Sequence, residues 1–308
     1  SLMLLNLKEY KELRSKGEPN DYVLVIDGDW LCYHSMSAVE NEVNWGDDRW
    51  TIDCDHSEAR RIVDNLIADY STRRKEWKDA AIVLAFTADD NWRKDISNAY
   101  KASRAGTRKP CGYWEFIKGV QHDYTSLLEP TLEGDDIMGI IGSNSGEFNY
   151  ENAVLVSVDK DFKTIPNCQF YWLTTGNILT QTEHTADYWH IFQTLKGDIT
   201  DGYTGVPSMG EETTVKFLEE PYGYIKYTHT FKSGARKGLS EERYKKVPKD
   251  EVGSLWDCIV SIADKNGMSE EDVIKQGQLA RILRWQDYDL IEQQIHLWKP
   301  SVSSCFLK

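Results

Sequence analysis

The sequence lacks the features that mark several classes of protein. Its apolar runs all fall well short of the length of a membrane span. The first ten residues do not combine a basic start with a long apolar stretch, so we expect no secretory signal, no membrane partner and a cytoplasmic location. The six cysteines are scattered without a Cys-x-x-Cys pair, which fits reduced thiols better than a disulfide framework.

Other absences narrow the chemistry. The sequence contains neither a Gly-x-Ser-x-Gly elbow nor a Gly-x-x-x-x-Gly-Lys-Ser/Thr loop, which argues against a serine hydrolase and a P-loop enzyme. The cysteines have no neighbouring histidines at spacings typical of zinc sites. We interpret Cys54-Asp55-His56 as local turn chemistry rather than a ligand cluster.

Bases are outnumbered, with 36 Lys and Arg against 50 Asp and Glu and a net charge of −14. Net charge alone would make the chain a poor candidate for binding nucleic acid, because phosphate contacts need Lys and Arg. The bases nevertheless gather into four clusters, at residues 73–75, 101–109, 232–237 and 243–246. The positions of the charges are therefore more informative than their sum.

Three continuous apolar runs predict buried strands, at Val23–Ile26, Ala81–Phe86 and Ala153–Val156. Such runs are typical of a sheet that is covered on both faces and is usually parallel. Between the first two lies a predicted helix, roughly Ser57–Lys78, with Ile62, Leu66, Tyr70 and Trp77 on one face. The order predicts an α/β fold with a mostly parallel central sheet flanked by helices.

From about Trp189 onward, segments with helical spacing that are punctuated by glycine predominate in the sequence. We expect an α/β core over residues 1–190, in which Phe170–Thr182 adds a strand and a short hairpin. Residues 191–308 are predicted to be mainly helical, ending in a helical stretch over Glu270–Trp298. Lys232–Val247 is basic and poor in apolar residues, which predicts a loop.

Acidic residues follow each predicted strand. Asp27 follows the first strand, Asp89 and Asp90 follow the second, and Asp159 and Asp161 follow the third. In an open parallel sheet, ligands bind beyond the carboxyl ends of the strands. These carboxylates are therefore expected at one edge of the sheet.

Two further acidic groups stand at turns beside glycine. Glu133-Gly134-Asp135-Asp136 opens an apolar helix, and Asp198 and Asp201 are three residues apart after Gly197. Any one of these pairs, taken alone, is more often a helix cap or a turn residue. Their combination with acid-terminated strands favours a functional site.

A cluster of this kind needs cations. Two like charges about 4 Å apart repel by about 4 kcal/mol at an effective dielectric of about 20. Oxygen-only ligands favour hard cations, so we expect Mg²⁺ or Mn²⁺, with two ions clamping a phosphate ester. The sequence therefore predicts metal-dependent phosphoryl chemistry.

A basic segment and a glycine turn are candidate nucleic-acid contacts. Arg93 follows the second strand, and Tyr100, Lys101 and Arg104 come shortly after it. The cations would bind phosphate and the ring would stack on a base, although a solvated basic helix is an equal alternative. In the turn, Gly205, Val206 and Gly210 precede a helix whose backbone N–H groups would hold a phosphate; an ordinary helix connection is the alternative.

These motifs together resemble the flap endonuclease/5′ nuclease superfamily, in its order and approximate spacing over roughly residues 21–220. The resemblance rests on Asp27-Gly28, the segment from Tyr100 to Arg104, Glu133 to Asp136, Asp159-Lys160-Asp161 and Gly197 to Asp201. Within the superfamily, nearly the whole chain looks like the 5′→3′ exonucleases of short-tailed lytic phages. The resemblance implies a PIN-like nuclease core and a helix–three-turn–helix motif at the Gly205 turn.

The resemblance also assigns roles to residues. It implies a first metal held by Asp27, Glu133, Asp135 and Asp136, and a second served by Asp159, Asp161, Asp198 and Asp201. Lys101 and Arg104 would lie in an arch and steer the scissile phosphate. The family has an acid after the second strand, for which Asp89 is our choice and Asp90 an alternative. The glycine turn would be a K⁺ site, although Ser208 stands where the family commonly has glycine.

The implied function is a 5′→3′ exonuclease that acts on duplex DNA 5′ ends and on RNA–DNA hybrids, with primer removal and host DNA degradation as its roles. Other phage replication proteins are implied partners, and the location would be the host cytoplasm. A flap endonuclease, or an RNase with a related sheet, is the alternative of the same chemistry. A non-catalytic DNA-binding relative is the third, and the complete set of acids argues against it.

Overall fold

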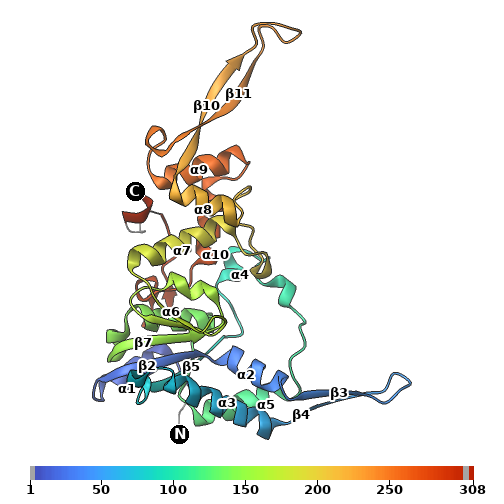
Figure 1. Cartoon of the computed structure of the whole chain (residues 1–308), viewed down its shortest axis with the longest axis vertical. Coiled ribbons are helices and arrows are strands. Elements are labelled where there is room, and N and C mark those ends of the chain that lie inside the picture. The colour runs from blue at the N-terminus through green and yellow to red at the C-terminus, as the bar shows by residue number, and fades with distance from the viewer. Residues whose placement is uncertain (1–3, 301–304) are drawn as a thin grey trace. The chain divides into compact units, whose positions relative to one another are not determined.

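The computed structural model describes residues 4–300 and 305–308, which divide into two compact units (Figure 1). The α/β unit comprises residues 4–95, 104–183 and 282–296. The helical unit comprises residues 96–103, 184–281, 297–300 and 305–308. Residues 96–103 and 282–296 thus belong to a different unit from the segments on both sides of them, whereas we expected one division near residue 190. None of the helices in these described ranges has the length and apolar character needed to cross a bilayer.

The α/β unit is built on a seven-stranded sheet in the order β1-β6-β5-β2-β7-β8-β9. All neighbouring strands are parallel except β8 and β9, which form the hairpin expected around Gly176. The strands are β1 (Leu4–Leu5), β2 (Asn20–Asp27), β5 (Ala81–Phe86), β6 (Ser126–Leu128), β7 (Tyr150–Ser157), β8 (Gln169–Trp172) and β9 (Asn177–Thr180). The predicted α/β class and the parallel sheet are confirmed.

The two faces of the sheet bury alternate residues of the same strands, as strand geometry requires. Leu24 and Ile26 pack in a core with helices α2 (Gly28–Ser37), α3 (His56–Thr72) and α5 (Tyr113–Asp123). The opposite face is covered by α6 (Gly134–Ser143), while α1 (Leu7–Ser15) packs against β6, next to the edge strand β1. Burying each Leu or Ile side chain contributes about 1.5–3 kcal/mol, so β2, buried on both faces, anchors the unit.

Helix α3 differs from its prediction in both extent and face. Its buried side chains are Ala59, Val63, Ile67 and Tyr70, not the stripe that includes Ile62 and Leu66. The helix ends at Thr72, and Trp77 is buried from a separate 3₁₀ turn, Lys75–Trp77. Asp55 caps the helix by accepting the Glu58 N–H at 3.0 Å, in line with the turn chemistry expected there.

The helical unit packs around a second apolar core. Its members come from α7 (Glu183–Lys196), the following turn, α8 (Glu211–Glu219), α9 (Leu255–Lys265) and α10 (Glu270–Ala280). Helix α10 ends at Ala280, so the predicted helical stretch to Trp298 is wrong beyond that residue. The rest of that predicted stretch contains the short strands β12 (Tyr288–Asp289) and β13 (Gln294–Ile295), which belong to the α/β unit.

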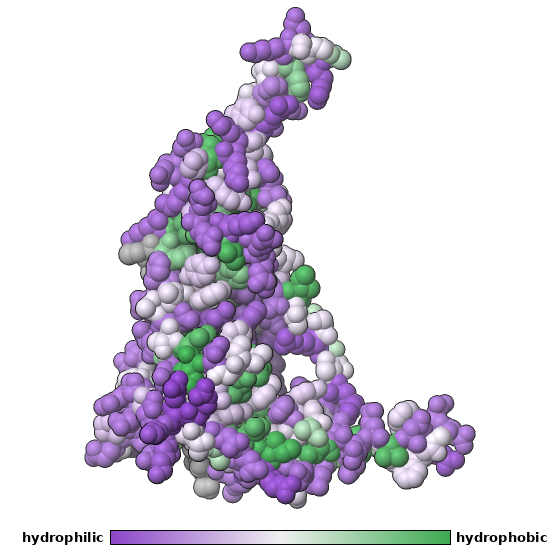
Figure 2. All heavy atoms as spheres, viewed as in Figure 1, coloured by the Kyte–Doolittle hydropathy of each residue, from purple (hydrophilic) through white to green (hydrophobic). Residues whose placement is uncertain are grey.

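Besides the antiparallel β12–β13 pair, two longer antiparallel hairpins were not predicted. One pairs β3 (Glu40–Asn44) with β4 (Trp50–Cys54), and the other pairs β10 (Tyr222–Thr230) with β11 (Ser240–Pro248). The prediction of a loop over residues 232–247 is therefore wrong from Ser240 onward. Figure 2 shows hydrophilic or neutral residues along most of the β10–β11 hairpin, so no apolar pattern marks its strands.

Candidate metal centre and flanking basic segments

The carboxyl end of β2 passes directly into helix α2. Asp27 is the N-cap of that helix and accepts the Trp30 N–H at 3.1 Å. A Cβ atom on Gly28 would lie 2.9 Å from the Ala85 carbonyl oxygen and still closer to the Phe86 ring. The missing side chain at Gly28 thus allows α2 to begin tight against β5, which places Asp27 at this edge of the sheet.

Helix α6 begins against the same strand end. A Cβ on Gly134 would lie 3.2 Å from the Ala85 oxygen, and the Gly134 N–H donates to Thr87 Oγ1 at 3.0 Å. The Thr87 N–H in turn donates to Asp29 Oδ2 at 2.7 Å. Burial raises the pKa of the Asp29 carboxyl, and the charge of Glu133 adds to this. The end of β5 therefore gathers the acidic starts of α2 and α6.

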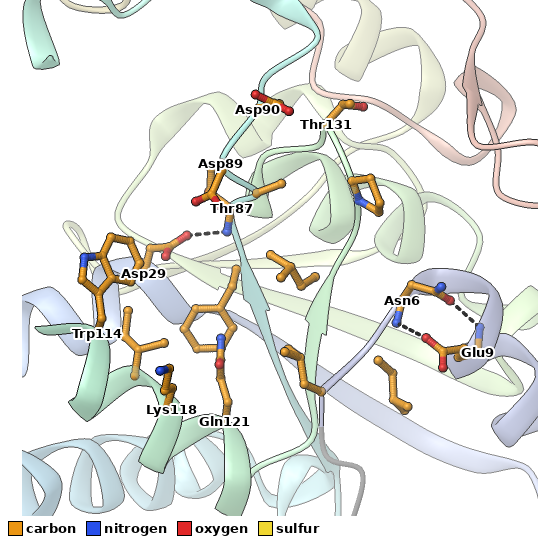
Figure 3. A pocket seen from close by; sticks show the side chains of 17 residues that line it. Asn6, Glu9, Asp29, Thr87, Asp89, Asp90, Trp114, Lys118, Gln121 and Thr131 are labelled. Atoms are coloured by element: carbon orange, nitrogen blue, oxygen red, sulfur yellow. Dashed lines mark hydrogen bonds between the residues drawn. The ribbon is translucent and has the colours of Figure 1, made fainter.

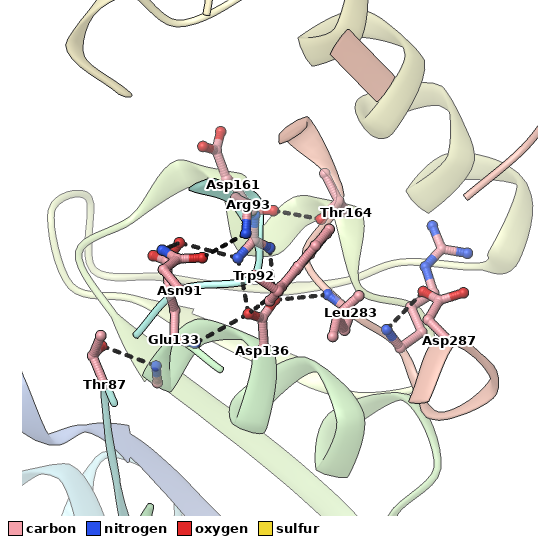
Figure 4. Close-up of polar contacts among 12 residues, drawn as sticks. Thr87, Asn91, Trp92, Arg93, Glu133, Asp136, Asp161, Thr164, Leu283 and Asp287 are labelled. Atoms are coloured by element: carbon pink, nitrogen blue, oxygen red, sulfur yellow. Dashed lines mark hydrogen bonds and ion pairs between the residues drawn. The ribbon is translucent and has the colours of Figure 1, made fainter. Parts of the chain in front are cut away.

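A buried arginine holds two of the expected ligands (Figure 4). Arg93 is 2% exposed, and its guanidinium donates to both oxygens of Asp136, at 2.7 and 2.8 Å, and to Glu133 Oε1 at 3.0 Å. Asp136 is fully buried and also accepts bonds from Trp92 Nε1 and the Leu283 N–H, both at 3.1 Å. Asn91 Nδ2 donates to Glu133 Oε1 at 2.7 Å.

This network differs from the expectation for Arg93 and refines that for Asp136. Arg93 is inside the protein and neutralises acids, so it does not present a surface contact for DNA. Asp136 has both oxygens bonded within the protein, which suits a positioning carboxylate. A buried charge needs such a partner, because removing one member of a buried pair costs about 3–5 kcal/mol. The partners Asn91 and Trp92 were not recognised from the sequence, although they immediately precede Arg93.

The acids after β7 form a short turn. Asp159 caps the 3₁₀ helix Lys160–Thr164 and accepts the Asp161 N–H at 2.8 Å. The Asp159 N–H donates to Oγ of the buried Ser157 at 3.1 Å, and Lys160 Nζ pairs with Asp161 at 3.0 Å. Both acids are half-buried. β7 lies next to β2, so these acids follow the strand beside the one that carries Asp27.

The two candidates after β5 lie in a loop. Asp89 and Asp90 are both exposed and both line a cavity beside this edge of the sheet. The structure thus leaves both residues available for the second-strand role.

In the helical unit, Asp198 and Asp201 flank a 3₁₀ turn, and Asp198 Oδ1 accepts the Asp201 N–H at 3.3 Å. The Asp201 carbonyl accepts the Lys101 N–H at 2.7 Å. Lys101 has a φ of +50°, an uncommon left-handed conformation for a residue other than glycine. A Cβ on Gly202 would lie 2.1 Å from the Ala99 oxygen, so this contact requires glycine.

The aromatic residue of the basic segment is buried. Tyr100 is 4% exposed and packs with Tyr203, Leu279 and Ala280, which differs from the expected base-stacking role. Lys101 is half-buried and Arg104 is exposed. Of the three candidate nucleic-acid contacts in this segment, the two cations are therefore more accessible than Tyr100.

The glycine turn uses its residues in different ways. The Gly205 N–H donates to Gln276 Oε1 at 2.8 Å, and Val206 is buried at 2% exposure in the core of the helical unit. Gly210 is exposed and is the N-cap of α8. Ser208 has a φ of +70°, which explains why glycine suits this position. Only the Gly210 end therefore keeps the surface position expected of a phosphate contact.

Comparison with known proteins places the chain in a family. A search against family models gives no match. The chain is 49% identical over 302 residues to an exodeoxyribonuclease of Enterobacteria phage T3, covering 97% of this chain and 99% of that protein. The identity is also 49% to the exonuclease of Escherichia phage T7, covering 97% and 100%. The chain belongs to this phage exonuclease family.

The predicted resemblance to phage exonucleases is confirmed, and the chain is an enzyme of this class. Solved structures support the fold. A variant of the T5 5′-exonuclease matches with a TM-score of 0.50 at 13% identity, covering 85% of this chain and 89% of the other. The T5 flap endonuclease, in a complex with DNA and metal ions, matches with a TM-score of 0.52 at 14% identity and the same coverage. At these identities the likeness concerns the fold alone.

Proposed function

We propose that this phage exonuclease is a divalent-metal-dependent 5′→3′ exodeoxyribonuclease that hydrolyses duplex DNA from its 5′ ends and releases 5′-phosphorylated nucleotides. The observation that carries the proposal is the gathering of acidic residues at the carboxyl ends of the adjacent strands β5, β2 and β7. These donors are all carboxylate oxygens, which fit Mg²⁺ or Mn²⁺.

Asp27, Glu133 and Asp135 are proposed as the ligands of one ion, with Asp89 or Asp90 nearby. Asp159 and Asp161 are proposed for a second ion, and Asp198 and Asp201 as the metal-binding carboxylates of the helical unit. Two ions of this kind supply activation of the attacking water and neutralisation of the leaving 3′ oxygen. Asp136 and Arg93 are assigned a positioning role, because their mutual bonds fix Glu133 at the start of α6.

Substrate binding is proposed to depend on the basic segments. Lys101 and Arg104 would bind the phosphates around the cut, and the exposed end of the Gly205–Gly210 turn would bind a phosphate farther along the duplex, with K⁺ as the candidate ion there. Because each neutralised phosphate releases counterions, binding should weaken steeply as salt is raised. The host cytoplasm is the proposed location, with other phage replication proteins as possible partners in that setting.

The test is product length on three substrates that carry internal or 5′ labels. A blunt duplex, a 5′ flap and an RNA–DNA hybrid are incubated with the wild-type chain and Mg²⁺ or Mn²⁺, with EDTA as the control. Mononucleotides from the duplex are the expected result, and from the RNA strand of the hybrid if primers are also substrates. No metal-dependent cleavage of any substrate would overturn the proposal.

A structure-specific flap endonuclease is the second candidate. It is favoured by the fold likeness to the T5 flap endonuclease. Its outcome in the same assay is one longer fragment released from the flap, with the blunt duplex left intact.

A further inference from the structure

A cavity of about 610 Å³ lies in the α/β unit, beside the carboxyl ends of β5 and β6 (Figure 3). This volume is within the range of sites that enclose a small molecule or a single nucleotide. The residues that line it come from the ends of β5 and β6, the N-terminal segment and one face of α5. The network of Arg93 and Asp136 does not use this space.

One end of the cavity is acidic and adjoins the candidate metal centre. Asp29, Asp89 and Asp90 line it together with Thr87. Thr87 connects this end to the start of α6, because its hydroxyl accepts the Gly134 N–H at 3.0 Å, next to Glu133. A phosphate held at the acidic edge of the sheet would therefore lie close to the opening of the cavity.

Helix α5 forms another wall of the cavity, where Figure 3 shows Trp114 beside Asp29. Trp114, Lys118 and Gln121 are spaced four and three residues apart, so they share one face of the helix, and all three line the cavity. The Trp114 side chain is 62% exposed, unlike the buried α5 residues Phe116 and Ile117. Its indole does not fill the core, and it leaves an aromatic surface open to a ligand.

We propose that this cavity binds the 5′-terminal nucleotide of the strand being cut, with its base against Trp114 and its 5′-phosphate near Lys118. The proposal rests on the proposed function, since it places the scissile phosphate at the acidic end. An indole stacks on any base because every base has a π-face, so the site fits an enzyme that reads an end and not a sequence.

The first experiment is a coupling measurement between Trp114 and the terminal base. Cleavage of duplexes with a normal or an abasic 5′-terminal nucleotide is compared for wild type, Trp114→Ala and Trp114→Phe. On the normal end, Trp114→Ala should raise KM roughly tenfold to a hundredfold, and Trp114→Phe should recover part of the loss. On the abasic end, wild type should show a similar loss and Trp114→Ala little further loss. Additive losses would overturn the proposal.

The second experiment locates the bound 5′-terminal nucleotide without measuring cleavage. A duplex with 5-iodouracil at the 5′-terminal or at the fifth nucleotide is bound in Ca²⁺ and irradiated, and mass spectrometry locates the crosslink. The terminal probe should crosslink to Trp114 and the internal probe should not. Trp45→Ala is the matched control, because Trp45 is 70% exposed on the β3–β4 hairpin and does not line this cavity. A terminal probe that crosslinks elsewhere would remove the assignment.

Lys118→Ala gives a third reading. It should reduce the preference for 5′-phosphate over 5′-hydroxyl ends while the Trp114 crosslink persists, and an unchanged preference would contradict the role of Lys118. These outcomes are distinct from failure of the proposed function. If the wild type cleaves in a metal-dependent manner but the Trp114 variants match it and no terminal crosslink forms, only the nucleotide site is wrong.

Discussion

The acids of the two units are held in different ways. In the α/β unit, Asp136 is fully buried and receives two bonds from Arg93, so its charge is balanced permanently. In the helical unit, Asp198 and Asp201 are half-buried in a turn, where Asp198 accepts a backbone N–H. A carboxylate removed from water needs a fixed cation, whereas one at an accessible turn can bind an exchangeable ion. The acids of the two units are thus not equivalent.

The largest expected effect is on catalysis, from Asp201→Asn. Loss of this proposed metal ligand should lower single-turnover cleavage of duplex DNA by about 10³-fold or more, the upper range for removing a charge-stabilising group. DNA binding, measured in Ca²⁺, should remain within a few-fold of wild type. Asp159→Asn should behave alike. Full activity in either variant would mean that these acids do not bind the metal.

Arg93→Met should act on stability. It leaves Asp136 and Glu133 buried without their cation, so we expect the free energy of unfolding to fall by about 3–5 kcal/mol. Chemical denaturation at pH 8 measures this, with Arg104→Met as the control because Arg104 is exposed. Equal stability of the two variants would contradict the positioning role of Arg93.

Lys101→Ala should slow cleavage by about 10²-fold, as expected for a group that stabilises charge near the reacting phosphate. The free energy of unfolding should change by less than about 1 kcal/mol, because the Lys101 bond to Asp201 is made by the backbone N–H and survives the substitution. A turnover equal to that of wild type would separate Lys101 from the chemistry.

Glu129 supplies a third kind of acid, buried beside neutral groups. It is fully buried, Gln293 donates to it at 3.2 Å, and burial raises its pKa to about 7. The folded state therefore holds a proton that the unfolded state has lost, and stability declines as pH rises from about 4.5 to about 7. Glu129→Gln should stabilise the protein by about 2–3 kcal/mol at pH 8 and change little at pH 4.5. Thermal unfolding at both pH values measures this, and an equal effect at both would exclude the titration.

The central sheet was predictable because β2, β5 and β7 are short apolar runs that end in acid. The β10–β11 hairpin could not be predicted, since its two strands expose most of their side chains and show no apolar alternation. Candidate ligands could be named because acids beside strand ends and glycines carry a local signal. Which of these acids is paired inside the protein could not be predicted, because the carboxylates that Arg93 contacts are 40 positions or more away in the sequence. Tyr100 failed as a base-stacking residue for the same reason, since Leu279 and Ala280 that cover it are remote in sequence.

Gly202 couples the positions of two charged residues of the helical unit, Lys101 and Asp201. Its backbone meets that of Ala99 so closely that any side chain would force the two strands of chain apart. Lys101 and the loop that carries Asp201 are therefore held together, so that neither can be displaced without the other. Any movement of this loop would therefore carry Lys101 and Asp201 together.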